Sequence, residues 1–374
     1  MDAGRPLCGE RAQHGPAVID HYDVAIVGGG PAGSACAWAL RRAGAQVVVL
    51  DAARFPRQKV CAGWVTPGVF RALELDPEEY RATGLVLQDV RAFRTAVIGG
   101  RHAVATQYET VVSYAIRRVE FDDYLLRRAA VPVLDNTRVA AIRRDRDEWI
   151  LNDRVAARTL VGAGGHFCPV ARLLNPPTAD RDIVVARELE TPVEGDTCEV
   201  DGLRPELFFC RDLDGYGWCV RKQAYVNIGF GRRGSREFQR HVAEFAEWLR
   251  TFVRLPEHVV DWRTWKGHAY RLRRPGPQVA ADGVLLVGDA AGLAWPESGE
   301  GIAPAVESGI AAARLIAALG SERERDARRS YAGIVSPAAP GWHVPMPAAV
   351  SRTLLRVPAV ARLALDRWFL RTAA

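Results

Sequence analysis

Short continuous apolar runs, bounded by glycine or acidic residues, mark the strands expected near both ends of the chain. Residues 24–27, 47–50 and 284–287 are such runs, and continuous apolar character is typical of parallel strands buried on both faces. Residues 34–43 and 302–319 instead have the composition of helices. Strands that alternate with helices in this way predict an α/β fold with a largely parallel sheet.

The middle of the chain has a different pattern, in which strands follow one another without long helices between them. Strands are expected at residues 182–189, 206–211, 216–221 and 224–230. Short connections between consecutive strands favour a mostly antiparallel sheet. Residues 235–254 predict an amphipathic helix whose apolar face comprises Phe238, Val242, Phe245 and Leu249.

The loop after the first predicted strand has a glycine spacing that suits a dinucleotide. Gly28, Gly30 and Gly33 match G-x-G-x-x-G between a strand and a helix. Such glycines permit a tight turn and a close approach of the backbone to a pyrophosphate at the helix N-terminus. Asp51 follows the second strand, where a carboxylate can accept hydrogen bonds from ribose hydroxyls and favours an unphosphorylated ribose over NADP.

A second stretch with features of a nucleotide site lies near the other end of the chain. Gly288 and Asp289 follow the strand at 284–287, where a carboxylate can bind a ribityl hydroxyl, although an ordinary turn has the same sequence pattern. Residues 298–302, Ser-Gly-Glu-Gly-Ile, then lead into a helix whose N-terminus would stabilise negative charge on a reduced flavin. The two stretches together indicate FAD rather than NAD.

These motifs resemble those of the flavoprotein superfamily with a para-hydroxybenzoate-hydroxylase-like fold, and most of all its geranylgeranyl reductase family. The similar segments are residues 28–33 with Asp51, then 55–63, 118–125, 215–218, 288–289 and 299–302. The resemblance implies a Rossmann-like three-layer FAD-binding domain, α/β in class and α+β overall. It also implies an inserted, mostly antiparallel substrate domain and a C-terminal helical segment.

The pattern and the resemblance together give expected domain boundaries. Residues 1–20 are expected to form a flexible tail. The FAD-binding domain would comprise residues 21–90, 115–175 and 276–335, the substrate domain residues 91–114 and 176–275, and the C-terminal helical segment residues 336–374.

The resemblance implies a set of residues that contact FAD. They are Gly28, Gly30, Pro31, Ala32, Gly33, Asp51, Arg57, Arg118, Gly288, Asp289, Gly299, Glu300, Gly301 and Ile302. Arg118 stands where the family has an arginine that reaches the cofactor; alternatively, it forms an i,i+4 surface pair with Asp122. The chain has no second nucleotide loop, and Gly164 replaces an aspartate usual in related hydroxylases. The electron donor therefore stays open among NADPH, ferredoxin and reduced flavin.

Three further side chains are implied to act on the substrate. Cys61 occupies the loop in which similar reductases place a cysteine near flavin and substrate, so it is the expected catalytic residue, as a proton donor or a positioning group. The proton could instead come from water. The family's Cys-Gly-Gly reads Cys-Ala-Gly here, and a small buried hydrophobe is the alternative role for this cysteine. Tyr216 and Trp218 lie on one face of a predicted strand, where they would line a substrate channel or belong to an ordinary sheet core.

Composition narrows the possible partners and compartment. The seven cysteines are odd in number and include no C-x-x-C pair, so neither a disulfide framework nor a metal site is expected. The net charge of +6 comes from scattered arginines without a nucleic-acid-binding motif. A polar start without a signal-peptide pattern predicts a cytoplasmic protein. Arginines mixed with leucine and aromatic residues over 351–371 predict either peripheral membrane contact or a cap on the substrate domain.

The expected function is that of an FAD-dependent oxidoreductase. The resemblance implies hydride transfer from N5 of reduced flavin to a carbon–carbon double bond of an apolar, isoprenoid-like substrate. One alternative is a flavin-dependent monooxygenase that hydroxylates an aromatic or natural-product substrate. A second is a flavin-binding protein without turnover.

Overall fold

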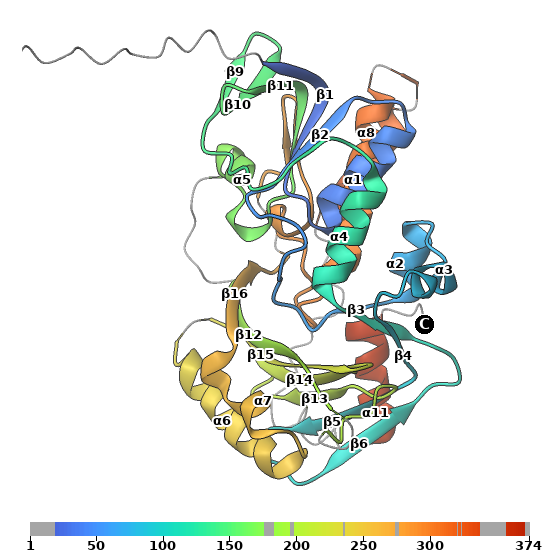
Figure 1. Ribbon diagram of the computed structural model, residues 1–374, viewed down its shortest axis with the longest axis vertical. Coiled ribbons are helices and arrows are strands. Elements are labelled where there is room, and N and C mark those ends of the chain that lie inside the picture. The colour runs from blue at the N-terminus through green and yellow to red at the C-terminus, as the bar shows by residue number, and fades with distance from the viewer. Residues whose placement is uncertain are drawn as a thin grey trace, which may run out of the picture.

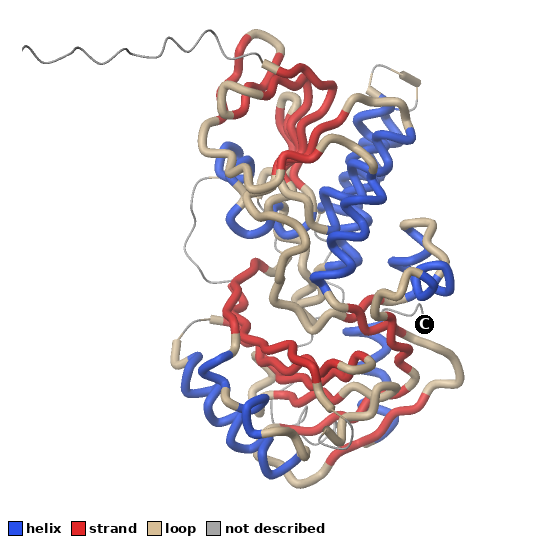
Figure 2. The backbone as a smooth tube through the Cα atoms, in the orientation of Figure 1, coloured by secondary structure: helices blue, strands red, loops and turns tan. Residues whose placement is uncertain are grey.

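Two large sheets lie at opposite ends of the molecule, with loops and a small third sheet between them (Figure 1, Figure 2). The computed structural model describes residues 19–175, 183–194, 198–234, 236–273, 277–319, 321–322, 324–336 and 357–370. The expected tail at 1–20 therefore lies almost entirely outside the described residues, as does the first half of the expected C-terminal segment.

The sheet at the top of Figure 1, here called the parallel sheet, contains the strands that the apolar runs predict. Its strands are β1 (Asp20–Val27), β2 (Val47–Leu50), β8 (Val133–Leu134), β9 (Ile142–Asp145), β10 (Glu148–Leu151), β11 (Val155–Gly162), β17 (Ala280–Ala281) and β18 (Val284–Leu286). In the order β18-β11-β1-β2-β8 neighbouring strands are parallel, and β17, β10 and β9 extend the sheet with antiparallel pairings. Every residue of β2 is buried, which explains its unbroken apolar sequence.

Helices cover both faces of the parallel sheet. On one face lie α1 (Pro31–Arg42), α4 (Arg118–Ala129) and α8 (Ile302–Ala318) (Figure 1). Helix α9 (Glu324–Val335) packs on α8. On the other side, α5 (Pro169–Leu174) packs against β11. The helices predicted at 34–43 and 302–319 are thus confirmed as α1 and α8, with ends that differ by a few residues.

The lower sheet of Figure 1, here called the antiparallel sheet, has the order β16-β12-β15-β14-β13-β5-β6. Its strands are β5 (Ala92–Val97), β6 (Ala103–Gln107), β12 (Ile183–Pro192), β13 (Glu206–Phe209), β14 (Gly215–Lys222), β15 (Tyr225–Arg233) and β16 (Lys266–Arg271). Only the β13–β5 pair is parallel among these described strands. The four strands expected in this region are confirmed.

Helix α6 (Phe238–Phe252) covers the outer face of the antiparallel sheet (Figure 1). The four apolar residues predicted for its inner face are all buried and pack with the sheet. The short helices α7 (Glu257–Val260) and η3 (Trp262–Thr264) follow it before the chain returns as β16.

A third, three-stranded sheet that the sequence pattern did not predict joins the two large ones. Its strands are β3 (Trp64–Val65), β4 (Leu87–Val90) and β7 (Ser113–Ile116), in the order β3-β7-β4. The helices α2 (Pro67–Ala72) and α3 (Pro77–Ala82) connect β3 to β4. These strands are too short to show an alternating pattern.

The described C-terminal residues form α11 (Pro358–Leu365) and the π-helical turn η5 (Asp366–Leu370). They pack against the antiparallel sheet on the side opposite α6 (Figure 1). Tyr108 donates a hydrogen bond to Asp366 Oδ1 at 2.7 Å. Among the described residues, no helix combines the length and apolar character needed to span a bilayer.

Candidate functional site

A cavity of about 300 Å³ lies between the two large sheets and brings together segments from the whole chain. Its lining includes twelve of the expected FAD contacts: Gly28, Gly30, Pro31, Ala32, Asp51, Arg57, Arg118, Asp289, Gly299, Glu300, Gly301 and Ile302. It also includes Cys61, Tyr216 and Trp218. Both glycine-rich stretches and all three expected substrate residues therefore face one space.

The loop between β1 and α1 has a backbone that excludes side chains. Gly28 has φ +115°, and a Cβ there would lie 2.4 Å from the carbonyl oxygen of Ala163. A Cβ on Gly33 would lie 1.9 Å from the carbonyl oxygen of Gly28. Gly33 is not in the cavity lining and instead allows α1 to start directly beneath the loop. This leaves the loop backbone and the α1 N-terminus open to the cavity, as a pyrophosphate requires.

Asp51 at the end of β2 supports this loop. Its two carboxylate oxygens accept hydrogen bonds from the backbone N–H groups of Gly29 (2.7 Å) and Ala53 (2.8 Å). Because a carboxylate oxygen can accept more than one hydrogen bond, the half-buried side chain retains capacity for a ligand hydroxyl at the cavity.

The second glycine-rich stretch folds against the first. The short turn η4 (Gly288–Ala290) starts at Gly288, whose backbone N–H donates to Ser308 Oγ on α8 at 3.0 Å. A Cβ added at Gly288 would lie 3.0 Å from the Cβ of Ala32. A Cβ on Gly301 would lie 3.2 Å from Asp289 Oδ1. Gly288 is therefore a packing residue below the cavity, and Asp289 faces the loop that precedes α8.

Two arginines of the cavity wall share one buried carboxylate. Arg118 donates to Asp122 through Nε (2.7 Å) and Nη2 (2.8 Å), and Arg57 Nη1 lies 3.3 Å from the same group. Asp122 has no exposed side-chain surface, so the alternative of a surface pair is wrong: the i,i+4 pair exists, but it is buried. Burial alone would lower the pKa of Arg118, but Asp122 and Cys61 together raise it above its usual value. The guanidinium is therefore a fixed positive charge at the cavity.

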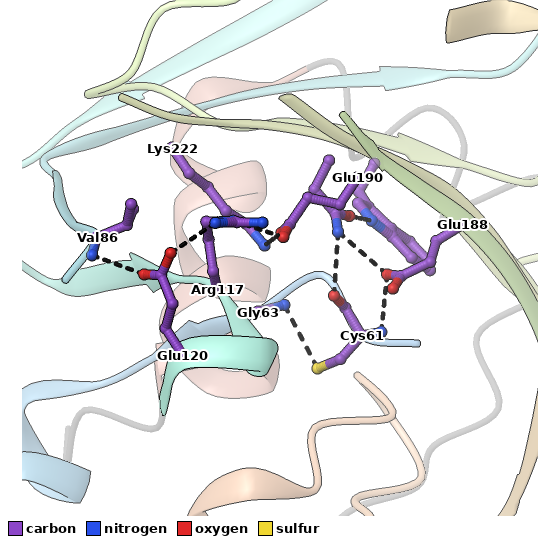
Figure 3. Close-up of polar contacts among 10 residues, drawn as sticks. Cys61, Gly63, Val86, Arg117, Glu120, Glu188, Glu190 and Lys222 are labelled. Carbon is purple, nitrogen blue, oxygen red and sulfur yellow. Dashed lines mark hydrogen bonds and ion pairs between the residues drawn. The ribbon is translucent and has the colours of Figure 1, made fainter. Parts of the chain in front are cut away.

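Cys61 lies in the loop before β3 and is held through its backbone. Its N–H donates to Glu188 Oε2 at 2.7 Å (Figure 3). Its carbonyl oxygen accepts from Asn227 Nδ2 at 3.3 Å. The Sγ atom accepts from the N–H of Gly63 at 3.4 Å. Cys61 is half-buried, whereas the other described cysteines are buried. Its thiol thus differs from theirs in facing a cavity.

Two further basic side chains, Lys59 and His268, also line the cavity. Lys59 Nζ is hydrogen-bonded to His268 Nε2 on β16. Burial lowers the pKa of Lys59 to about 8, and the nearby positive charges of Arg118 and Arg57 add to this shift. Asp289 and Cys61 oppose it. Burial and Lys59 lower the pKa of His268 to about 3, so the imidazole is neutral at pH 7 and accepts the bond. Lys59 belongs to a motif identified in the sequence; His268 is a lone histidine without a motif.

Aromatic rings form the opposite wall. Tyr216 donates to the carbonyl oxygen of Ser298 at 2.5 Å, which joins the antiparallel sheet to the second glycine-rich stretch. Phe369 from η5 also lines the cavity, with its ring centre 5.4 Å from that of Tyr216 and 5.5 Å from that of Trp64. The C-terminal segment thus supplies a wall residue that no motif predicted.

The turn after β11 holds His166 and Cys168. His166 lines the cavity, whereas Cys168 is 1% exposed and belongs to the core. Among the described residues, no group of three or more histidine, cysteine or acidic side chains is arranged to hold a metal ion.

The residues present fit FAD. The cavity offers a side-chain-free loop at a helix N-terminus for a pyrophosphate, a carboxylate beside that loop for a ribose, and a second carboxylate across the cavity. Fixed guanidinium charge matches the negative charge of the cofactor, and aromatic rings suit a planar ring system.

Comparisons with known proteins agree with this reading. The family described as FAD binding domain matches residues 21–339. The chain is 30% identical to a menaquinone reductase of Mycobacterium tuberculosis, over 80% of this chain and 77% of the relative. It is 26% identical to a geranylgeranyl diphosphate reductase of Rhodobacter capsulatus, over 84% of this chain and 80% of the relative.

Solved structures share the fold at lower identity. A geranylgeranyl bacteriochlorophyll reductase-like protein of Thermoplasma acidophilum matches with a TM-score of 0.70 at 19% identity, covering 94% of this chain and 97% of that one. A probable FAD-dependent monooxygenase of Pseudomonas aeruginosa matches with a TM-score of 0.66 at 21% identity, covering 94% and 100%. With its cavity, its motifs and these relatives, the chain belongs to the FAD binding domain family and is an FAD-dependent oxidoreductase.

Proposed function

We propose that this enzyme reduces a carbon–carbon double bond of an apolar, isoprenoid-like substrate in the cavity between the two sheets. The observation that carries the proposal is the position of Cys61, which faces one cavity together with both glycine-rich stretches and the aromatic wall of Tyr216 and Trp218. The names of the relatives, which include reductases of geranylgeranyl compounds and of menaquinone, support this substrate class.

The cofactor would be held by the loop backbone at Gly28 and Gly30, by Asp51 and Asp289, and by Arg118. Reduced FAD, when bound, supplies a hydride to one alkene carbon. Cys61 is assigned the matching proton: its S–H bond breaks, a C–H bond forms at the second carbon, and water restores the thiol proton. The aromatic wall would exclude bulk water and orient the apolar chain.

The same reasoning extends to domains and location. We assign residues 21–90, 115–175 and 276–335 to FAD binding, and residues 91–114 and 176–275 to the substrate.

Contact with a membrane surface through the C-terminal segment is supported by Leu363, which is 64% exposed on α11 beside exposed Arg362. Co-sedimentation with vesicles of anionic lipid at low salt tests this contact, and protein that stays in the supernatant contradicts it.

The first experiment follows the visible spectrum of the purified protein without oxygen. After reduction by dithionite, geranylgeranyl diphosphate or menaquinone should reoxidise the flavin and yield a product two hydrogens heavier. Reoxidation by oxygen alone, with a hydroxylated product, would favour the monooxygenase suggested by the shared fold with such an enzyme. Reoxidation by oxygen without product would favour a flavin binder without turnover, and protein that cannot be loaded with FAD contradicts all three.

The role of Cys61 is tested in the same assay. Cys61→Ser should lower the rate of flavin reoxidation by the alkene by at least about tenfold, because a hydroxyl is a weaker acid than a thiol. The matched control is Cys210→Ser, a buried cysteine outside the cavity lining. An unchanged rate in Cys61→Ser would remove the proton-donor assignment and leave FAD binding intact.

A further inference from the structure

A chain of buried polar groups lies behind the cavity and connects two of its walls. Glu188 on β12 and Asn227 on β15 are 8% and 1% exposed and are not among the residues that line the cavity. Asn227 Nδ2 donates to Glu188 Oε2 at 3.2 Å, and the same oxygen accepts the N–H of Cys61 at 2.7 Å. The two side chains thus form the support on which the Cys61 loop lies.

The amide of Asn227 is oriented by three partners. An indole nitrogen only donates, so the 2.7 Å contact with Trp218 Nε1 identifies the Asn227 atom as the acceptor Oδ1. Nδ2 then faces the carbonyl oxygen of Cys61 at 3.3 Å and the Glu188 carboxylate. Gly229 on β15 makes room for the indole, because a Cβ there would lie 2.2 Å from Trp218 Cζ2. One amide therefore contacts both the Cys61 loop and an aromatic wall residue.

Of the two neighbouring carboxyl groups on β12, Glu188 and Glu190, only Glu188 has its pKa raised by its surroundings. Glu190, two residues along β12, accepts from Lys222 Nζ at 2.7 Å and Arg117 Nε at 2.9 Å (Figure 3). These cations lower the pKa of Glu190 in spite of its burial. Burial, with a smaller contribution from Glu190, raises the pKa of Glu188 to about 7, although Lys222, Asn227 and the Cys61 N–H oppose the shift.

We propose that Glu188 and Asn227 are positioning residues that fix the Cys61 thiol relative to the indole of Trp218. Neither touches the cavity, and both act through hydrogen bonds to residues that do. The proposal rests on the proposed role of Cys61 for its effect on turnover, but not for its effect on the loop.

The test compares Glu188→Gln and Glu188→Ala in the FAD-loaded protein. Glutamine keeps an acceptor for the Cys61 N–H and Asn227 but cannot ionise, whereas alanine removes the acceptor. Glu188→Ala should lower kcat for alkene reduction about tenfold or more with a smaller change in KM, and Glu188→Gln should restore kcat at pH 6 to within about threefold. Glu206→Gln is the control, because Glu206 is a buried carboxyl of the same sheet that pairs with Arg94 away from the cavity.

A second readout does not depend on turnover. The rate of Cys61 alkylation by iodoacetamide is measured by mass spectrometry of its peptide between pH 6 and pH 8. As pH rises through about 7, the wild-type Glu188 gains a negative charge beside the Cys61 loop that glutamine cannot gain. Glu188→Gln lacks this charge and should be alkylated about threefold faster at pH 8 but at the wild-type rate at pH 6.

Parallel alkylation profiles in the wild type and Glu188→Gln, together with unchanged kcat in Glu188→Ala, would overturn the proposal. If Cys61→Ser turns over at the wild-type rate but the two alkylation profiles still diverge, the catalytic role of Cys61 fails and the positioning role stands. Asn227→Leu provides an independent check, since it should raise KM and lower kcat while leaving FAD content unchanged.

Discussion

At the scale of single residues, Asp51 shows how one side chain serves the fold and the expected cofactor together. The sequence motif assigns it to a ribose, but its carboxylate also accepts two backbone N–H groups, one of them inside the glycine loop. That second role is invisible in the sequence, because it depends on how the loop after β1 and the end of β2 approach each other.

Replacement of Asp51 by alanine should therefore weaken FAD binding more than loss of a ribose contact alone. Loss of the acceptor leaves N–H groups at Gly29 and Ala53 without their partner, and such a loss costs about 1–3 kcal/mol, or roughly tenfold to a hundredfold in Kd. Fluorescence titration of the apoprotein with FAD measures the effect. Asp23→Ala is the control, because Asp23 likewise accepts a backbone N–H, from Gln46, but does not line the cavity. Equal affinities in the two variants would contradict this account.

At the scale of elements, the approach of α8 to α1 brings the two glycine-rich stretches together. Gly309 on α8 lies so close to α1 that a Cβ would be 2.3 Å from the carbonyl oxygen of Ala32. The apolar runs and glycine spacings predicted both helices, but their sequence positions gave no sign that they touch. Each helix start carries half of the expected cofactor site, so this contact determines the geometry of the site.

Gly309→Ala should separate the helices and destabilise the protein by about 1–3 kcal/mol, with loss of bound FAD, because backbone cannot yield to a new methyl group as a flexible side chain can. Gly333→Ala is a matched control on α9, where nothing lies within 4 Å of a new Cβ. That substitution should instead stabilise the protein by roughly 0.5–1 kcal/mol. Urea unfolding of both variants measures the difference, and two changes of the same sign would refute the packing argument.

At the scale of the whole molecule, the cavity is assembled from segments that are distant in the sequence. The loop at Cys61, strand β14, the stretch before α8 and the C-terminal turn η5 meet at one place. Phe369 lines the cavity and is 2% exposed among Trp64, Tyr216 and Phe209. The C-terminal segment thus supplies part of the cavity wall, and a cap on the substrate side stays a prediction.

Phe369→Ala should lengthen the apolar end of the cavity and shift preference toward longer isoprenoid chains. Removal of the ring opens space, and each additional methylene buried there contributes about 0.8 kcal/mol. The ratio of kcat/KM for substrates of increasing prenyl number measures the shift. Leu370→Ala is the control, because Leu370 is buried in the same turn without lining the cavity. An unchanged length preference in Phe369→Ala would show that η5 does not bound the substrate.

The sequence by itself determined the features that depend on local spacing. Continuous apolar runs identified β2 and β18, glycine spacing identified the loop before α1, and alternation placed Tyr216 and Trp218 on one face. These signals are local because the periodicity of a strand or a tight turn is a property of a few consecutive residues.

Only the tertiary structure decided which distant side chains meet. The Lys59–His268 bond, the support of Cys61 by Glu188 and Asn227, and the place of Phe369 in the wall join residues from different elements. Burial also places the Arg118–Asp122 pair inside the molecule at the cavity, where a surface pair had been the alternative. Such contacts and burials depend on the packing of the two sheets, which no local pattern records.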